Sequence, residues 1–158
     1  MATLEDLKTL YAEYIVTAEQ VQRKAPALAG FLGLGNDPRK DRCHDEFFAA
    51  AEAWSAEFLA AEPSQAEATE AVRFILHAAH ENPNTPAYWY LYAVHGVTRP
   101  LIPLLAEETC RELARFYDEV YPAMDRPPVQ REVYKLLQQY AGQKVPSGSF
   151  LQRLFGKK

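Results

Sequence analysis

The sequence has only two cysteines, and it has no apolar run long enough to cross a membrane. Cys43 and Cys110 each lack a nearby second cysteine, whereas zinc sites and small secreted domains place cysteines in close pairs. The longest apolar stretch, near residues 87–95, is far shorter than the roughly 20 residues of a transmembrane helix. The N-terminal segment carries acidic residues where a secretory signal has basic ones. We therefore expect reduced thiols, no stable membrane insertion and a soluble cytoplasmic protein.

The sequence also lacks the usual phosphate-binding and catalytic motifs. Gly30, Gly33 and Gly35 follow a predicted helix instead of a strand, so they indicate a turn and not a dinucleotide-binding loop. Residues 1–141 contain 13 basic and all 21 acidic side chains, a net charge of −8, whereas residues 142–158 contain four basic side chains and no acidic one. A body this acidic repels phosphate backbones. Nucleic acid is therefore not expected as a partner, and no cofactor is indicated.

Apolar residues are plentiful, and they recur at helical spacing. The 158 residues are 48% hydrophobic and include nine tyrosines and eight phenylalanines, enough apolar surface for one folded domain. Apolar positions three and four apart predict helices over residues 4–28, 38–61, 65–81, 86–95, 101–121 and 128–141. No stretch alternates as a half-buried strand does. We predict an all-α, irregular bundle of about six helices, or a short repeat-like stack of helical hairpins, in residues 1–141.

Two features define the predicted helices of the first half more closely. Ser64 and Glu67 form a capping-box pattern that begins the helix at residue 65. The helix over residues 38–61 has an apolar stripe with Phe48 and Leu59 flanking it; the stripe consists of Phe47, Ala51, Trp54 and Phe58. The short loop between these two helices predicts that they pack as antiparallel neighbours.

The helix over residues 86–95 is apolar on all sides, which is typical of a central helix. Its tyrosine hydroxyls and its indole N–H need polar partners when they are buried. We therefore expect a binding groove rimmed by the aromatic side chains of this helix, namely Tyr88, Trp89, Tyr92 and His95. His95 precedes Gly96, so the sequence further predicts an imidazolium that caps the helix at its C-terminus.

The histidines and one cysteine are the candidates for chemistry. His77 and His80 are three residues apart and share a helical face with Glu70, Arg73 and Glu81, which favours a solvated polar face over a metal site. Cys43 lies in the first turns of a predicted helix, but the adjacent His44 points about 100° away from it, so a buried, inert thiol is preferred. The alternative is a small metal- or thiol-dependent enzyme that uses His44, His77, His80 and Cys43.

Residues 142–158 form a polar linker followed by a basic amphipathic segment. Four large apolar side chains would line one side of a two-turn helix, and lysines follow them; they are Phe150, Leu151, Leu154 and Phe155. Such a segment docks in a groove of its own chain, enters a groove of a partner, or contacts an anionic membrane surface. Docking within the chain is the interpretation we prefer.

Together these observations predict a non-enzymatic helical domain that binds another protein. The reasons are the absence of a catalytic constellation, the acidic body, the number of amphipathic helices and the apolar tail segment. The identity of the partner and the oligomeric state are not encoded in any motif of the chain.

Overall fold

The computed structural model describes residues 2–24 and 38–142, and all regular secondary structure in these ranges is helical. In chain order the elements are α1 (Leu4–Lys24), α3 (Pro38–Ala60), α4 (Gln65–Glu81), α5 (Tyr88–Ala93), the 3₁₀ helices η1 (Val94–Thr98) and η2 (Ile102–Leu104), α6 (Glu107–Val120), the 3₁₀ helix η3 (Ala123–Asp125) and α7 (Pro128–Tyr140). The all-α bundle predicted from the sequence is confirmed. Within the described ranges, no helix is both long and apolar enough to span a bilayer.

Three predicted features lie outside the described residues. They are the end of the first helix at residues 25–28, the glycine-containing turn up to residue 37, and the apolar tail residues Phe150, Leu151, Leu154 and Phe155.

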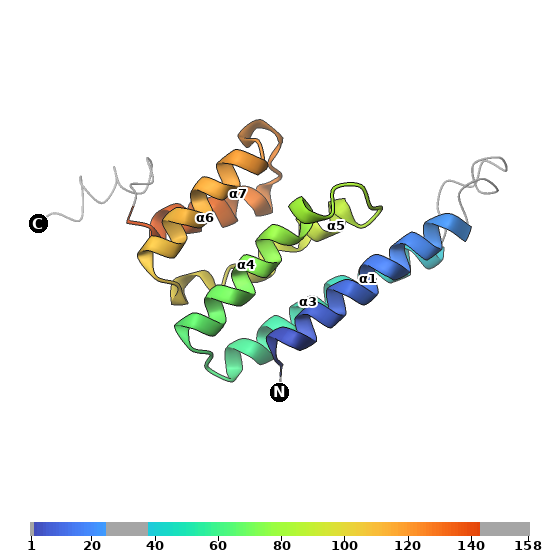
Figure 1. The fold of residues 1–158 in the computed structure, drawn as a ribbon, viewed down its shortest axis with the longest axis horizontal. Helices are drawn as coiled ribbons and strands as arrows, with labels where there is room; N and C mark the ends of the chain where they lie inside the picture. The colour runs from blue at the N-terminus through green and yellow to red at the C-terminus, as the bar shows by residue number, and fades with distance from the viewer. Residues whose placement is uncertain (1, 25–37, 143–158) are drawn as a thin grey trace, which may run out of the picture.

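The helices are arranged as two hairpins on either side of a middle layer (Figure 1). α1 and α3 lie side by side as one long hairpin, and α6 and α7 form the other. α4 lies between them, and α5 and η1 pack against it. η1 also contacts both α3 and α7, so it joins the two hairpins. Because α4 contacts both sides, its apolar stripe is wide, and it buries Ala68, Ala71, Val72, Ile75, Leu76, Ala78 and Ala79.

The helix starts follow the capping chemistry of the sequence. The Ser64 backbone N–H donates to Glu67 Oε1 at 2.8 Å, and the Glu67 N–H donates to Ser64 Oγ at 3.1 Å, which confirms the capping box. Thr3 and Asp6 form the same reciprocal pair at the start of α1, at 3.0 and 3.1 Å. These side chains satisfy backbone donors that a helix leaves unpaired in its first turn.

The predicted helix over residues 86–95 is wrong in its length and its end. α5 has only six residues, and the chain continues into η1 with Gly96 inside that 3₁₀ helix. A Cβ on Gly96 would lie 2.9 Å from Val129 Cγ1, so glycine is needed for the close approach of η1 to α7. The glycine therefore serves tertiary packing and does not end the helix.

The prediction of one continuous helix over residues 101–121 is also wrong. A short 3₁₀ helix, η2, comes first, and Leu105 and Ala106 then take extended backbone conformations before α6 begins at Glu107. Pro103 lacks an N–H donor, so it fits the first turn of η2 but would interrupt the hydrogen bonds of a longer helix. The two elements together bury Ile102, Leu105, Cys110 and Leu113.

Candidate functional site

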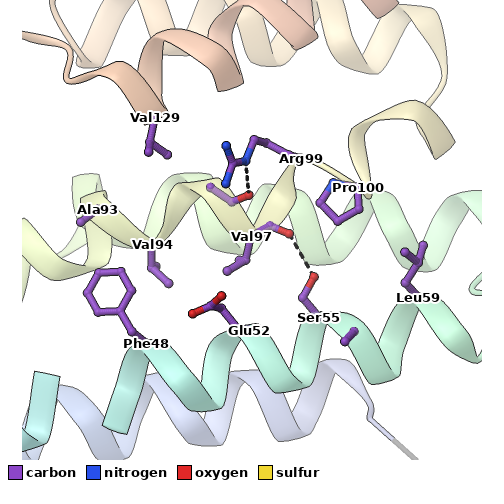
Figure 2. A pocket seen from close by; sticks show the side chains of 12 residues that line it. Phe48, Glu52, Ser55, Leu59, Ala93, Val94, Val97, Arg99, Pro100 and Val129 are labelled. Carbon is purple, nitrogen blue, oxygen red and sulfur yellow. Dashed lines mark hydrogen bonds between the residues drawn. The ribbon is translucent and has the colours of Figure 1, made fainter. Parts of the chain in front are cut away.

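An apolar groove lies between α3 and η1 on the described surface. Its volume is about 500 Å³. Figure 2 shows the side chains of α3 facing those of η1 across it, with Val129 of α7 on the far side of η1. Eight of the 12 lining residues are apolar, and these are Phe48, Ala56, Leu59, Ala93, Val94, Val97, Pro100 and Val129.

The spacing of residues on α3 explains one wall of the groove. Phe48, Glu52, Ser55 and Leu59 follow one another at steps of four, three and four residues, which places them on one helical face. The Ser55 hydroxyl donates a 3.0 Å hydrogen bond to the Val97 carbonyl oxygen. This bond links α3 to η1 and fixes the position of one wall of the groove relative to the other.

The two charged residues of the groove differ in their surroundings. The Arg99 side chain donates to Glu132 Oε2 at 2.7 Å and to the Gly96 carbonyl oxygen at 3.0 Å, so two of its N–H donors are satisfied within its own chain. Glu52 is exposed, and no cationic side chain of the described residues forms an ion pair with it. The groove therefore presents apolar walls and one carboxylate without a counter-ion from the described part of the chain.

The four aromatic residues predicted to rim a groove lie elsewhere. None of them lines the groove between α3 and η1. Trp89 is exposed, with 69% of its surface accessible, and Tyr88 is half-buried beside it. Tyr92 is buried and stacks on Tyr121 at 4.9 Å between ring centroids. Tyr92 and His95 therefore pack against Tyr117 and Tyr121, whereas Trp89 is left at the surface.

The prediction that a charged His95 caps its helix is wrong. His95 is fully buried, and its Nδ1 lies 2.8 Å from the Tyr117 hydroxyl. Its Nε2 has no hydrogen-bond partner within the described chain. Burial lowers the pKa of His95 to about 3, because the charged ring would lose its hydration in the protein interior. The imidazole is therefore neutral in the fold at ordinary pH.

His44 and Cys43 lie with Tyr14 at the contact of α1 and α3. The Tyr14 hydroxyl is 2.6 Å from His44 Nδ1, and Cys43 Sγ is 3.8 Å from the same nitrogen. The His44 ring also stacks on Tyr90, with 3.5 Å between centroids. Burial, and secondarily the neighbouring Cys43 and Tyr90, raise the pKa of Tyr14. Cys43 is half-buried, in contrast to the buried thiol that we expected.

His77 and His80 lie apart from this cluster, at the contact of α4 with α6. His77 is half-buried and stacks on Phe116 at 3.8 Å, whereas His80 is exposed. Burial is the main cause that lowers the pKa of His77. In residues 2–24 and 38–142, no three His, Cys, Asp or Glu side chains are grouped as metal ligands. His77 is thus less solvated than the polar face predicted from the sequence.

The two thiols should differ strongly in reactivity. Cys110 is fully buried, and burial raises its pKa to about 11, so it is almost entirely protonated at pH 8. We expect iodoacetamide at pH 8 to label Cys43 at least about tenfold faster than Cys110 in the native protein, and both thiols after unfolding in guanidinium. Peptide mass spectrometry measures the two rates. Cys43→Ser is the control and should abolish native labelling; equal rates would contradict the burial of Cys110.

The groove was not predicted from the sequence, although one signal for it was present. Phe48 and Leu59 were recognised as flanking the buried stripe of α3. Eleven residues, about three helical turns, separate them, so they form a second apolar edge on the same helix. The opposite wall had no such signal, because Val97 belongs to the 3₁₀ helix η1 and Pro100 to the turn after it. The path of η1 depends on its packing against α7.

Comparison with known protein families, with curated proteins and with solved structures finds no significant match to this chain.

Proposed function

We propose that this chain is a helical protein-binding domain that holds an apolar segment of a partner protein in the groove between α3 and η1. The supporting observation is the groove itself, which has apolar walls along three turns of α3. Grooves of this kind accept the apolar face of an amphipathic helix. Leu59, with 36% of its surface exposed, and the half-buried Phe48 would contact that face.

The polar groups around the groove favour a peptide over a small polar metabolite. Small-molecule sites enclose most of the ligand and direct several polar groups toward it. Here the Ser55 hydroxyl donates to Val97, and the Arg99 guanidinium donates to Gly96 and Glu132. Half of the lining residues are exposed, namely Glu52, Ala56, Leu59, Ala93, Arg99 and Pro100. The surface that remains to bind a ligand is therefore open and mainly apolar.

The alternative function is a thiol-dependent enzyme, and the contact between Cys43 and His44 is the observation in its favour. The 3.8 Å separation of Cys43 Sγ and His44 Nδ1 is within the range of a thiol hydrogen bond. However, the groove includes neither residue. Alkylation kinetics distinguish the two functions: a thiol activated by an imidazole keeps its labelling rate at pH 6, whereas an ordinary thiol reacts much more slowly there than at pH 8.

Site-specific photo-cross-linking tests the proposed binding function. A photoreactive amino acid is placed at Leu59, in the groove, or at Val16, an exposed apolar position on α1. We expect that the photoreactive group at position 59 cross-links to a specific protein in the native host, and that the same group at position 16 does not. With purified components, Leu59→Glu should weaken the binding of that protein at least about tenfold, because a carboxylate would be buried against an apolar face.

Val16→Glu is the matched control, since it places the same charge on an apolar surface position outside the groove. It should leave the dissociation constant unchanged. Capture of the same proteins from both positions, or binding that Leu59→Glu does not weaken, would overturn the proposal. Thermal unfolding of both variants verifies that neither substitution disturbs the fold.

A further inference from the structure

We propose that the tail segment Phe150–Phe155 of the same chain occupies the groove and competes there with the partner. This inference rests on the proposed function, because it assigns a regulator to the same groove. The tail sequence FLQRLF has the apolar pattern that such a groove accepts, with Phe150, Leu151, Leu154 and Phe155 on one side when it is helical.

The length of chain after α7 permits this contact. Val129, in the first turn of α7, lines the groove. From Val129 to Gly142 there are 13 residues, which span about 20 Å as a helix. From Gly142 to Phe150 there are eight residues, which reach about 27 Å when extended. The segment can therefore return along α7 and reach the groove without any change in the described fold.

The segment is also short enough to fit within the groove. The groove wall from Phe48 to Leu59 covers 11 residues of α3, about 16 Å along the helix axis. A helix from Phe150 to Phe155 covers about 8 Å. Four large side chains of the segment would therefore fit between the apolar ends of the groove, which are formed by Phe48 at one end and by Leu59 and Pro100 at the other.

Charge complementarity favours the tail as the occupant. The groove presents the Glu52 carboxylate without a cation from the described residues, while the neighbouring Arg99 is paired with Glu132. The tail supplies Arg153 within the segment, and Lys157 and Lys158 after Gly156. Residues 1–141 have a net charge of −8 and the tail has four positive charges. Long-range electrostatic attraction therefore also draws the tail toward the rest of the chain.

Intramolecular photo-cross-linking in the full chain tests this proposal. Benzoylphenylalanine replaces Leu154, and normal and ¹⁵N-labelled proteins are mixed at low concentration before irradiation. We expect cross-links to peptides that contain residues 48–59 or 93–100, each within a single isotope form. Cross-links between isotope forms, which indicate a second copy, cross-links to other parts of the chain, or no protein cross-link would each overturn the proposal.

Two sets of variants make the assignment specific. Leu59→Glu should lower the yield of the groove cross-link at least about fivefold, and Val16→Glu should leave it unchanged. Glu52→Lys should lower the yield about twofold to threefold, as expected for an exposed ion pair, and Arg153→Glu in the same chain should restore it. An unchanged yield in Leu59→Glu, or no restoration in the charge-reversed pair, counts against the groove as the docking site.

This experiment contains no partner protein, so its failure leaves the proposed binding function intact. Conversely, groove cross-links from position 154 together with no specific capture from position 59 would support the tail contact and contradict partner binding. The two proposals therefore fail on different observations.

Discussion

Acidification from pH 7.5 to pH 4.5 should destabilise the fold by about 3 kcal/mol through His95 alone. The pKa of His95 falls from its ordinary value of 6.5 to about 3 in the fold, because the ring is fully buried among Tyr92, Tyr117 and Tyr121. In the unfolded chain, the His95 imidazole therefore binds a proton below about pH 6.5, whereas in the folded chain it binds one only below about pH 3. The free energy of unfolding therefore has its full value above pH 6.5, and it decreases as the pH falls from 6.5 toward 3.

The size of the effect follows from the same shift. At about 1.36 kcal/mol per pKa unit, the loss approaches about 5 kcal/mol once the pH is below both values. Urea unfolding at pH 7.5 and pH 4.5 measures the free energy of unfolding. His95→Gln keeps a polar group for the Tyr117 hydroxyl but does not titrate, so it should lose about 3 kcal/mol less than the unmodified chain over this interval.

His80→Gln is the matched control, because His80 is an exposed histidine whose substitution leaves His95 in place. It should retain the full loss of stability on acidification. The burial-based account of His95 is refuted if His95→Gln and the unmodified protein lose equal free energy between the two pH values.

Arg126→Ala should reduce the free energy of unfolding by about 3 kcal/mol, because it removes a buried guanidinium that donates hydrogen bonds to three acceptors. The Arg126 side chain is 4% exposed. It donates to the carbonyl oxygens of Tyr121 and Tyr117 at 2.8 and 3.2 Å and to Asp118 Oδ1 at 3.2 Å. The guanidinium carbon also lies 4.4 Å from the centroid of the Tyr134 ring. Alanine would leave these acceptors without their donor.

Two variants separate hydrogen bonding from packing at this position. Arg126→Met fills most of the volume but donates nothing, so most of the loss should remain. Arg131→Ala removes an exposed arginine from α7 and should change stability by less than about 0.5 kcal/mol. A loss below about 1 kcal/mol in Arg126→Ala, measured by urea unfolding, would contradict the role of Arg126 as the link between η3, α6 and α7.

The helices that could be predicted from the sequence are those whose signals are local. Ser64 and Glu67 are three residues apart, and the capping box needs only these two side chains and their own backbone. The buried stripes of α1, α3 and α4 recur every three to four residues, so they predict both the helix and its inner face. For these elements, local propensity and the final fold agree.

Other features depended on distant contacts. Gly96 is a helix terminator by propensity, but Val129 on α7 is the neighbour that requires a glycine there. His95 resembles a helix cap until Tyr117, 22 residues later, is found beside its ring. Arg126 lies in a proline-rich turn that the sequence marks only as a loop, and its acceptors come from α6 and the turn after it. No periodic pattern in the sequence predicts contacts between residues this far apart.

The sequence by itself determined an all-α chain and its main helix boundaries, because caps and amphipathic stripes involve residues within one or two turns of each other. Tertiary structure alone decided that His95 is buried and neutral and that Arg126 joins α6 to α7. It also decided that Phe48 and Leu59 form one wall of a groove. Burial and charge pairing depend on which helices meet, and that is decided by the simultaneous packing of all of them.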